Sequence, residues 1–406
     1  MPLSRLMTMV PRNAKPIAIA GGGIGGLACA LGLAQRGFKT IVLEQAREFG
    51  EVGVGLQVAP NALHVLDALG VGARAKKDAF LIERMVMMDA VSGEEVVNIP
   101  CGEAFQARFG NPYAVAHRAD IHGALLEGCR SYGLIELRTS SRVTGFDIGD
   151  RGASVVLGTG EHIDAAALVG ADGVHSRIRR KIVNDGEPLA SGAVIYRAVI
   201  PATDMPRDQQ KPYPTLWAGP GTHIIYYPVR DWTMFNFGGT VVTGQTAINE
   251  DDEAPAEEVL PLFSRNCDIP LRVMRVPPRF RRYLIRYREP VENWSSGPVT
   301  LLGDAAHPMV QYIAQGAAMA LEDAICLAVT ADECDGDFAA AFERYQAIRI
   351  VRSARVQISS LLMDKIYHAS QVARQVRNSI FEGRTPAEHY DRLSWLYTAP
   401  PYVKSR

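Results

Sequence analysis

Short apolar runs alternate with helical patterns over much of the chain. Residues 16–20 and 40–43 are apolar, and residues 27–35 between them carry apolar side chains at helical spacing. Residues 165–169 form another apolar run, which leads into an Asp-Gly turn and a basic segment. The stretch from Leu301 to Asp323 begins apolar, passes through Gly-Asp and small residues, and becomes a run of helix formers near Gly316. This order predicts buried strands whose polar turns open into helices, as in α/β proteins.

The middle and the end of the chain have different patterns. Apolar and polar residues alternate over residues 193–200, 222–228 and 233–239, which predicts antiparallel strands. Residues 338–377 are strongly helical, and arginines recur along them at Arg344, Arg349, Arg352 and Arg355. A basic helix can contact a membrane or lipid, but a solvated face is the more frequent explanation. The aromatic tail from residue 390 to 402 is expected to fold back on the protein or on a partner subunit.

Composition narrows the class of protein. The chain has 406 residues, of which 47% are hydrophobic, so it can bury a large core. A formal net charge of -1 gives no electrostatic reason to expect a nucleic-acid partner. Neither a membrane-spanning run nor the apolar core of a signal peptide is visible, and residues 1–15 are expected to form a frayed tail. The six cysteines are scattered without metal-ligand spacing, which favours reduced thiols in a cytoplasmic protein and no metal site.

The first glycine cluster carries a specific chemical meaning. Gly21, Gly23 and Gly26 follow a strand and open a helix in the G-x-G-x-x-G pattern. Glycine at these positions permits a tight turn and lets backbone amides approach a pyrophosphate. Glu44 ends the second strand about 20 residues later, where a carboxylate binds the hydroxyls of an adenosine ribose. These residues predict a dinucleotide site without deciding between NAD and FAD.

Two later motifs, in this order, resemble a known family. The stretch around Asp172 reads G-A-D-G-x-x-S-x-x-R, and the stretch around Asp304 reads G-D-A-A-H-P. With the glycine cluster, they resemble the single-component FAD-dependent aromatic hydroxylases, flavoprotein monooxygenases built like 4-hydroxybenzoate hydroxylase. The resemblance implies bound FAD contacted by both aspartates and by the turn at Gly316 and Ala317. It also implies that Arg47 reaches the cofactor phosphates and that Arg118 contacts FAD.

The expected fold is α/β, with a Rossmann-like FAD-binding domain of the glutathione-reductase type, an antiparallel-sheet substrate domain and C-terminal helices. In the resembled family, NADH and O2 are consumed and a flavin C4a-hydroperoxide transfers oxygen to an activated aromatic ring. The pattern and the resemblance together predict an FAD-binding domain at residues 1–80, 110–190 and 290–335, a substrate-binding sheet at 81–109 and 191–289, and a helical region at 336–406.

A phenol becomes more nucleophilic when it loses its proton, so this chemistry favours a base, and histidine suits that role near neutral pH. On strict alternation His223 and Tyr227 share one face of a predicted strand with Ile225, so both side chains could face a pocket. The alternative is a histidine satisfied on a packed sheet face. His307 is another candidate base, although its place in the third motif favours a structural or cofactor-positioning role.

Gln311 stands where most relatives of the third motif carry proline, and a buried amide there would need a partner such as a substrate hydroxyl. Together with His223, Tyr227 and Tyr113, it resembles the 3-hydroxybenzoate 6-hydroxylases. That resemblance implies para-hydroxylation of 3-hydroxybenzoate to 2,5-dihydroxybenzoate (gentisate). His223 would take the phenol proton with Gln311 orienting it, and the two tyrosines would hold the ring and its carboxylate.

Several alternatives stay open from the sequence. The substrate could be another small aromatic acid, such as salicylate or 6-hydroxynicotinate. A nucleotide-binding protein without catalysis and an NAD dehydrogenase are hypotheses from other classes. A homodimer is a further expectation, with the aromatic tail and the basic helix as candidate contact surfaces.

Overall fold

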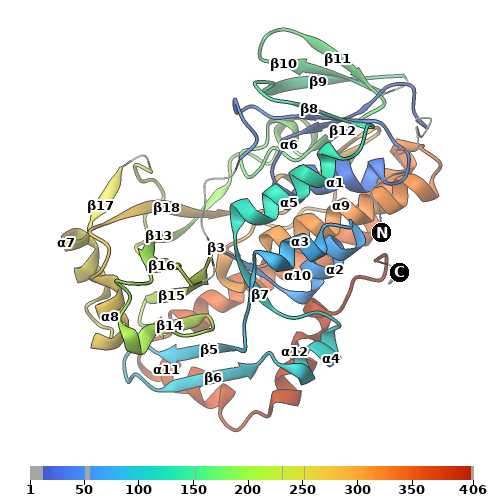
Figure 1. The fold of residues 1–406 in the computed structure, drawn as a ribbon. Coiled ribbons are helices and arrows are strands. Elements are labelled where there is room, and N and C mark those ends of the chain that lie inside the picture. Colours follow the sequence, from blue (N-terminus) through green and yellow to red (C-terminus); the bar gives the residue numbers. More distant parts are fainter. Residues whose placement is uncertain (1–11, 51–54, 151, 231, 251, 404–406) are drawn as a thin grey trace.

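The computed structural model of the protein describes residues 12–50, 55–150, 152–230, 232–250 and 252–403. Most of the expected frayed tail and part of the glycine-rich stretch 45–60 lie outside these residues. Four sheets and twelve α-helices make up the described part of the chain. Figure 1 shows strands β9 to β11 at the upper end and the largest sheet at the lower left, with long helices between. None of the helices in the described ranges is long and apolar enough to cross a membrane.

The first large sheet has the order β19-β20-β12-β1-β2-β8 and is parallel except for its last pair, β19 with β20. Its central strands β1, β2 and β12 are buried along their whole length, which explains why they are short, continuously apolar runs in the sequence. Its strands are β1 (Ile17–Ala20), β2 (Thr40–Leu43), β8 (Ile135–Arg138), β12 (Ala167–Gly170), β19 (Ser295–Ser296) and β20 (Val299–Leu301).

The second large sheet has the order β17-β18-β13-β16-β15-β14-β5-β6. It is antiparallel as expected, except that β14 and β5 pair in parallel. Its strands are β5 (Arg84–Asp89), β6 (Glu95–Pro100), β13 (Leu189–Pro201), β14 (Thr215–Gly219), β15 (Thr222–Val229), β16 (Met234–Val242), β17 (Glu253–Pro255) and β18 (Arg279–Tyr287).

Two small antiparallel sheets complete the strands of the described residues, one of β9 (Val143–Gly149), β10 (Gly152–Leu157) and β11 (His162–Ala165), the other of β3 (Gly55–Val58), β4 (Phe80–Leu81) and β7 (Ala114–His117). Strand β3 falls in the glycine-rich stretch of residues 45–60. It is held there because the amide of Gly55 donates to the Asn236 side chain of the second large sheet.

The helices divide by position. Helix α1 packs against α5 and α9, and α9 against α10, so the apolar faces of the nucleotide-binding half are covered. The N-terminal helices are α1 (Ile24–Ala34), α2 (Pro60–Ala68), α3 (Gly72–Lys77), α4 (Glu103–Phe109), α5 (Arg118–Arg130) and α6 (Arg177–Ile182). The later ones are α7 (Ala256–Val259), α8 (Asp268–Met274), α9 (Gly316–Glu333), α10 (Phe338–Tyr367), α11 (Gln371–Phe381) and α12 (Pro386–Tyr397).

The fold confirms the α/β class and the FAD-domain-plus-sheet architecture expected from the sequence. The predicted helical region near the C-terminus is broken after Tyr367, where α10 ends and α11 begins at Gln371. The aromatic tail folds back on the protein itself, because the Tyr402 hydroxyl accepts a hydrogen bond from Arg349 at 2.6 Å. The division into domains by residue number stays a prediction.

Candidate functional site

The glycine turn brings the ends of two strands into close contact. Gly21 has φ +109°, and a Cβ there would lie 2.3 Å from the carbonyl oxygen of Ala171. A Cβ on Gly26 would lie 2.0 Å from the carbonyl oxygen of Gly21. Any larger residue would force apart the turn and helix α1, which begins after its N-cap Gly23. The first turn of α1 therefore presents its free amides to the cavity that all three glycines line.

The acid at the end of β2 is fixed beside that helix start. Glu44 accepts hydrogen bonds from the amides of Gly22 and Ala46, each at 2.8 Å, and lines the same cavity. Arg118, the first residue of α5, also lines it. Arg47 is exposed and does not line the cavity, so its contact with cofactor phosphates stays a prediction.

The second motif positions the carboxylate of Asp172, one oxygen of which has no hydrogen-bond partner among the described residues. Asp172 accepts a hydrogen bond from the amide of Arg177 at 2.8 Å through Oδ2. Its Oδ1 is buried and has no partner among the described residues, and burial raises the pKa of this carboxyl group. A buried acceptor without a partner costs free energy unless a ligand supplies a donor. Because Asp172 lines the cavity, its free oxygen fits a hydroxyl of bound FAD.

The last arginine of this motif connects it to the third motif. The Ser176 hydroxyl accepts the amide of Arg179 and caps α6. The Arg179 guanidinium, fully buried, donates to the carbonyls of Ala305 and Ala306 and pairs with Asp185. Arg179, the last residue of the second motif, therefore holds the backbone of the G-D-A-A turn and keeps Asp304 at the cavity wall.

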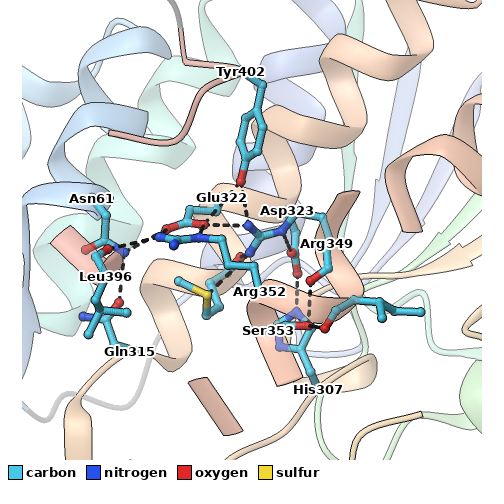
Figure 2. A network of polar contacts seen from close by, with 12 residues as sticks. Asn61, His307, Gln315, Glu322, Asp323, Arg349, Arg352, Ser353, Leu396 and Tyr402 are labelled. Atoms are coloured by element: carbon cyan, nitrogen blue, oxygen red, sulfur yellow. Dashed lines mark hydrogen bonds and ion pairs between the residues drawn. The ribbon is translucent and has the colours of Figure 1, made fainter. Parts of the chain in front are cut away.

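A buried ion-pair cluster lies behind that turn (Figure 2). Asp323 accepts the amide of Gly303 at 2.9 Å, and the Nε2 of His307 lies 2.6 Å from the same carboxylate oxygen. Arg349 donates to both Asp323 and Glu322 at 2.6 Å. Because His307 is bound to Asp323 and does not line the cavity, a structural role fits it better than that of a base. The cluster fixes the turn that precedes Gly316 and Ala317, which both line the cavity.

This cluster corrects the interpretation of the C-terminal arginines. A solvated face was expected, yet Arg349 is fully buried and Arg352 donates to Glu322 from a largely buried position. Arg344, paired with Glu333 at the surface, and Arg355, which is exposed, behave as the pattern indicated. The helical spacing was correct, but the acidic partners on α9 become apparent only when α9 and α10 pack together.

The cavity at this site has a volume of about 950 Å³ and is lined by all three motifs and by the second large sheet. His223, Ile225 and Tyr227 line it from β15, which confirms the predicted alternation, whereas Ile224 and Tyr226 point into the core behind the sheet. Tyr113 also lines it, and its hydroxyl donates to Gln57 at 2.8 Å. A single space therefore joins the dinucleotide motifs to the candidate catalytic side chains.

His223 has a defined partner. Its side chain is buried, and its Nδ1 lies 2.8 Å from Nε2 of His368. Burial first, and then the neighbouring His368, lower the pKa of His223 well below the usual range of histidine. The ring is therefore neutral near neutral pH, with a lone pair able to accept a proton. The sequence did not indicate His368, which lies 145 residues away along the chain.

Gln311 is also already paired. Its Oε1 accepts a hydrogen bond at 2.6 Å from Nη2 of Arg197, a residue of β13 that the sequence analysis did not single out. Among the described residues no carboxylate forms an ion pair with Arg197, and burial lowers the pKa of this guanidinium. An arginine within an apolar strand was the available signal. Both side chains line the cavity, which therefore contains a half-buried cation held by an amide.

Comparison with known proteins agrees with this geometry. Residues 14–334 match the family model described as FAD binding domain. The chain is 45% identical to the 3-hydroxybenzoate 6-hydroxylase of Polaromonas naphthalenivorans (strain CJ2), over 94% of this chain and 95% of that protein. It is 43% identical to 3-hydroxybenzoate 6-hydroxylase 1 of Aquipseudomonas alcaligenes, over 94% and 97%.

A solved structure extends the comparison of the fold. Klebsiella pneumoniae HpxO, complexed with FAD and uric acid, has a TM-score of 0.81 at 22% identity, over 96% of this chain and 99% of that one. The resemblance drawn from the three motifs is thereby confirmed. The chain belongs to the FAD binding domain family, and it is a flavoprotein monooxygenase that binds FAD.

Proposed function

We propose that the protein uses NADH and O2 to hydroxylate 3-hydroxybenzoate at the carbon para to its hydroxyl, giving 2,5-dihydroxybenzoate. The observation that carries this proposal is two groups on one cavity, a buried neutral histidine, His223, and a half-buried cation, Arg197, that has no carboxylate partner among the described residues. One suits a phenol and the other a carboxylate. The names of the two similar hydroxylases support the same substrate.

The cofactor residues follow from the geometry. The amides at the start of α1, the Glu44 carboxylate and the free oxygen of Asp172 would hold FAD, with Asp304 and the Gly316 turn nearby. When bound, FAD supplies the redox chemistry that takes electrons from NADH and activates O2. The protein has three further tasks: to place the substrate, to control its proton and to keep water away.

The substrate would be held at both ends. Its carboxylate pairs with Arg197, whose position is set by the hydrogen bond to Gln311. Its hydroxyl lies at His223, which accepts the phenol proton and so raises electron density at the para carbon. Tyr227 lines the same wall, and Tyr113 is oriented by its bond to Gln57. The tyrosines were expected to hold the carboxylate, but Arg197 offers the charge that they lack.

The test is turnover by the purified yellow protein with 3-hydroxybenzoate, measured as NADH consumed, peroxide released and product identified. We expect strong stimulation of NADH oxidation, little peroxide and 2,5-dihydroxybenzoate as product. Stimulation by salicylate or 6-hydroxynicotinate instead would overturn the substrate assignment. Cytoplasmic location and a homodimer stay predictions from the sequence.

The assignment of residues is tested by His223→Ala and Gln311→Ala. We expect hydroxylation to slow by about 10²-fold or more while NADH oxidation continues with release of peroxide, because losing the general base, or the amide that positions Arg197, slows the transfer and not the reduction. His162→Ala is a matched control, since His162 lies on strand β11, outside the cavity. If both cavity variants hydroxylate the substrate with as little peroxide release as the unmodified protein, neither residue takes part in the mechanism.

A further inference from the structure

Three polar side chains form a continuous line from the cavity toward the outside of the protein. His223 Nδ1 lies 2.8 Å from His368 Nε2, and His368 Nδ1 lies 2.9 Å from Asp364 Oδ1. Exposure rises along this line, from a buried His223 to 6% for the His368 side chain and 42% for Asp364. The inner end lies at the cavity, and the outer end reaches solvent.

Helix α10 and strand β15 hold these three side chains in place. Asp364 and His368 are four residues apart at the end of α10, which places both side chains on one face of the helix. The carbonyl oxygen of His368 accepts the amide of Gly221 at 3.1 Å. That bond fastens the end of α10 to the turn before β15, the strand that carries His223. The rings of Tyr312 and Tyr367 pack around His223, with ring centroids 5.3 and 5.4 Å from that of its imidazole.

The carboxylate determines which ring nitrogens carry hydrogen. An ionised Asp364 only accepts, so His368 must donate to it from Nδ1, and in the neutral form of His368 the lone pair then lies on Nε2. That lone pair accepts from His223, which must therefore carry its hydrogen on Nδ1. The Nε2 of His223 is left as the acceptor, the form that a base toward a substrate hydroxyl requires.

We propose that His223, His368 and Asp364 form a proton relay that carries the phenol proton of a bound aromatic acid from the cavity to solvent. The proposal rests on the proposed function only in requiring a phenolic ligand. The phenol gives its proton to Nε2 of His223, whose Nδ1 proton moves to Nε2 of His368, and the Nδ1 proton of His368 moves to Asp364. Each ring gains one proton and loses one, and the carboxyl group releases the last to water. Return of a proton to the product oxygen reverses the steps and restores both rings.

The relay explains how a deeply buried histidine can act as a base. Burial lowers the pKa of His223, so the ring does not retain an added charge. The hydrogen bond from His368 lowers the pKa of Asp364, which keeps the outer carboxylate ionised. The other titratable groups facing the line are Tyr312, Tyr367 and Lys365; burial raises the pKa of both tyrosines, so they stay neutral.

The arrangement of hydrogens is tested first, on FAD-loaded protein without substrate. Nuclear magnetic resonance of isotope-labelled histidine distinguishes the two neutral forms of each ring. We expect both His223 and His368 to carry hydrogen on Nδ1. A His223 protonated on Nε2 would overturn the relay whatever the substrate proves to be.

The transfer is tested with His368→Gln and Asp364→Asn, which keep polar side chains in place but cannot pass a proton. The absorbance of a bound phenolic acid reports its ionisation directly. We expect phenolate formation to slow by about tenfold or more, and its midpoint to rise by about one pH unit, while benzoate, which has no phenol, binds as before.

Asp391→Asn is the matched control for the second test, because Asp391 is an exposed acid on α12 paired with Arg108. FAD content in each variant reports folding. Unchanged rates and midpoints in both relay variants would overturn the proposal. Because ionisation is measured on any phenolic acid that binds, a wrong product in turnover would refute the substrate assignment and leave this test valid.

Discussion

A buried cluster of charges and a half-buried cation lie on either side of the third motif, and they differ in how their charge is compensated. Behind the turn, Glu322 and Asp323 meet Arg349 and Arg352, so each buried carboxylate has a guanidinium partner (Figure 2). In the cavity, Arg197 meets only the neutral amide of Gln311 among the described residues. The first group is complete within the protein, whereas the second lacks an anion.

The difference separates structural from functional charge. Removing charges from water costs several kcal/mol per ion, and a complementary partner offsets most of that cost. A folded chain therefore keeps an incompletely compensated buried cation only where something else compensates it, such as a ligand. Burial alone does not identify a site, because Arg349 is more deeply buried than Arg197 and is compensated by Glu322 and Asp323 within the protein. Buried charge without a counter-ion is the more specific signal.

The largest effect is expected from breaking the compensated cluster. Arg349→Met leaves Glu322 and Asp323 short of a cation, and such a loss typically lowers the free energy of unfolding by about 3–5 kcal/mol. Urea unfolding followed by circular dichroism measures it. Arg344→Met is the control, since Arg344 forms an exposed pair with Glu333 and should cost about 0–1 kcal/mol. Equal losses in the two variants would show that the cluster is not stabilised by compensation.

Removing the Arg197 cation should change ligand affinity and not the free energy of unfolding, the reverse of the result expected for Arg349→Met. Arg197→Met is expected to weaken binding of the aromatic acid by about 10- to 100-fold, the range for losing a charge-assisted hydrogen bond, without lowering the free energy of unfolding. Titration with 3-hydroxybenzoate measures the affinity. An uncharged 3-substituted phenol serves as the control ligand and should bind both proteins alike. Equal weakening for both ligands would mean that Arg197 acts on the cavity generally and not on the carboxylate.

A third buried acid, Asp89, allows compensation of a buried charge to be tested through the pH dependence of stability. Burial raises the pKa of Asp89, but hydrogen bonds from Arg374 and Asn378 dominate, and the pKa falls to about 2. Since this lies below the value of an unfolded Asp, the stabilisation is complete above about pH 4 and is lost as pH falls toward 2.

We therefore expect the free energy of unfolding to drop by about 1–2 kcal/mol from Asp89 over that interval. Asp89 fastens α11 to β5 through Arg374 and Arg377. Urea unfolding between pH 5 and pH 2 should give a shallower dependence in Asp89→Asn than in the unmodified protein. The same slope in both would contradict the assignment of this carboxylate as a compensated charge.

The smallest effect is expected at the edge of the compensated cluster. Tyr402→Phe removes a hydroxyl that accepts from Arg349 at 2.6 Å but leaves both ion pairs of that arginine in place. A loss of about 1 kcal/mol follows, the usual net value of one hydrogen bond. Urea unfolding compares it directly with Arg349→Met. A loss as large as that of the arginine variant would mean that the tail, and not the ion pairs, holds the cluster together.

Features of the site that depend on local chain geometry were predicted correctly. The glycine turn, the Asp172 turn and the strand face shared by His223 and Tyr227 each depend on residues close together in sequence, where backbone sterics and strand alternation decide the outcome. The same reasoning predicted α1 and α9 because each follows a strand and a polar turn. The dinucleotide site was therefore evident before any tertiary contact was known.

Features that join distant parts of the chain were not predictable. The arginines of α10 have the spacing of a solvated face, and only the packing of α10 against α9 gives Arg349 its carboxylate partners. Gln311 was assigned a substrate partner, yet Arg197 reaches it from a strand 114 residues away. Short-range pattern determined the fold class and the cofactor turns. Long-range packing alone decided which buried charges are compensated, because that depends on the distance between side chains that sequence separation does not specify.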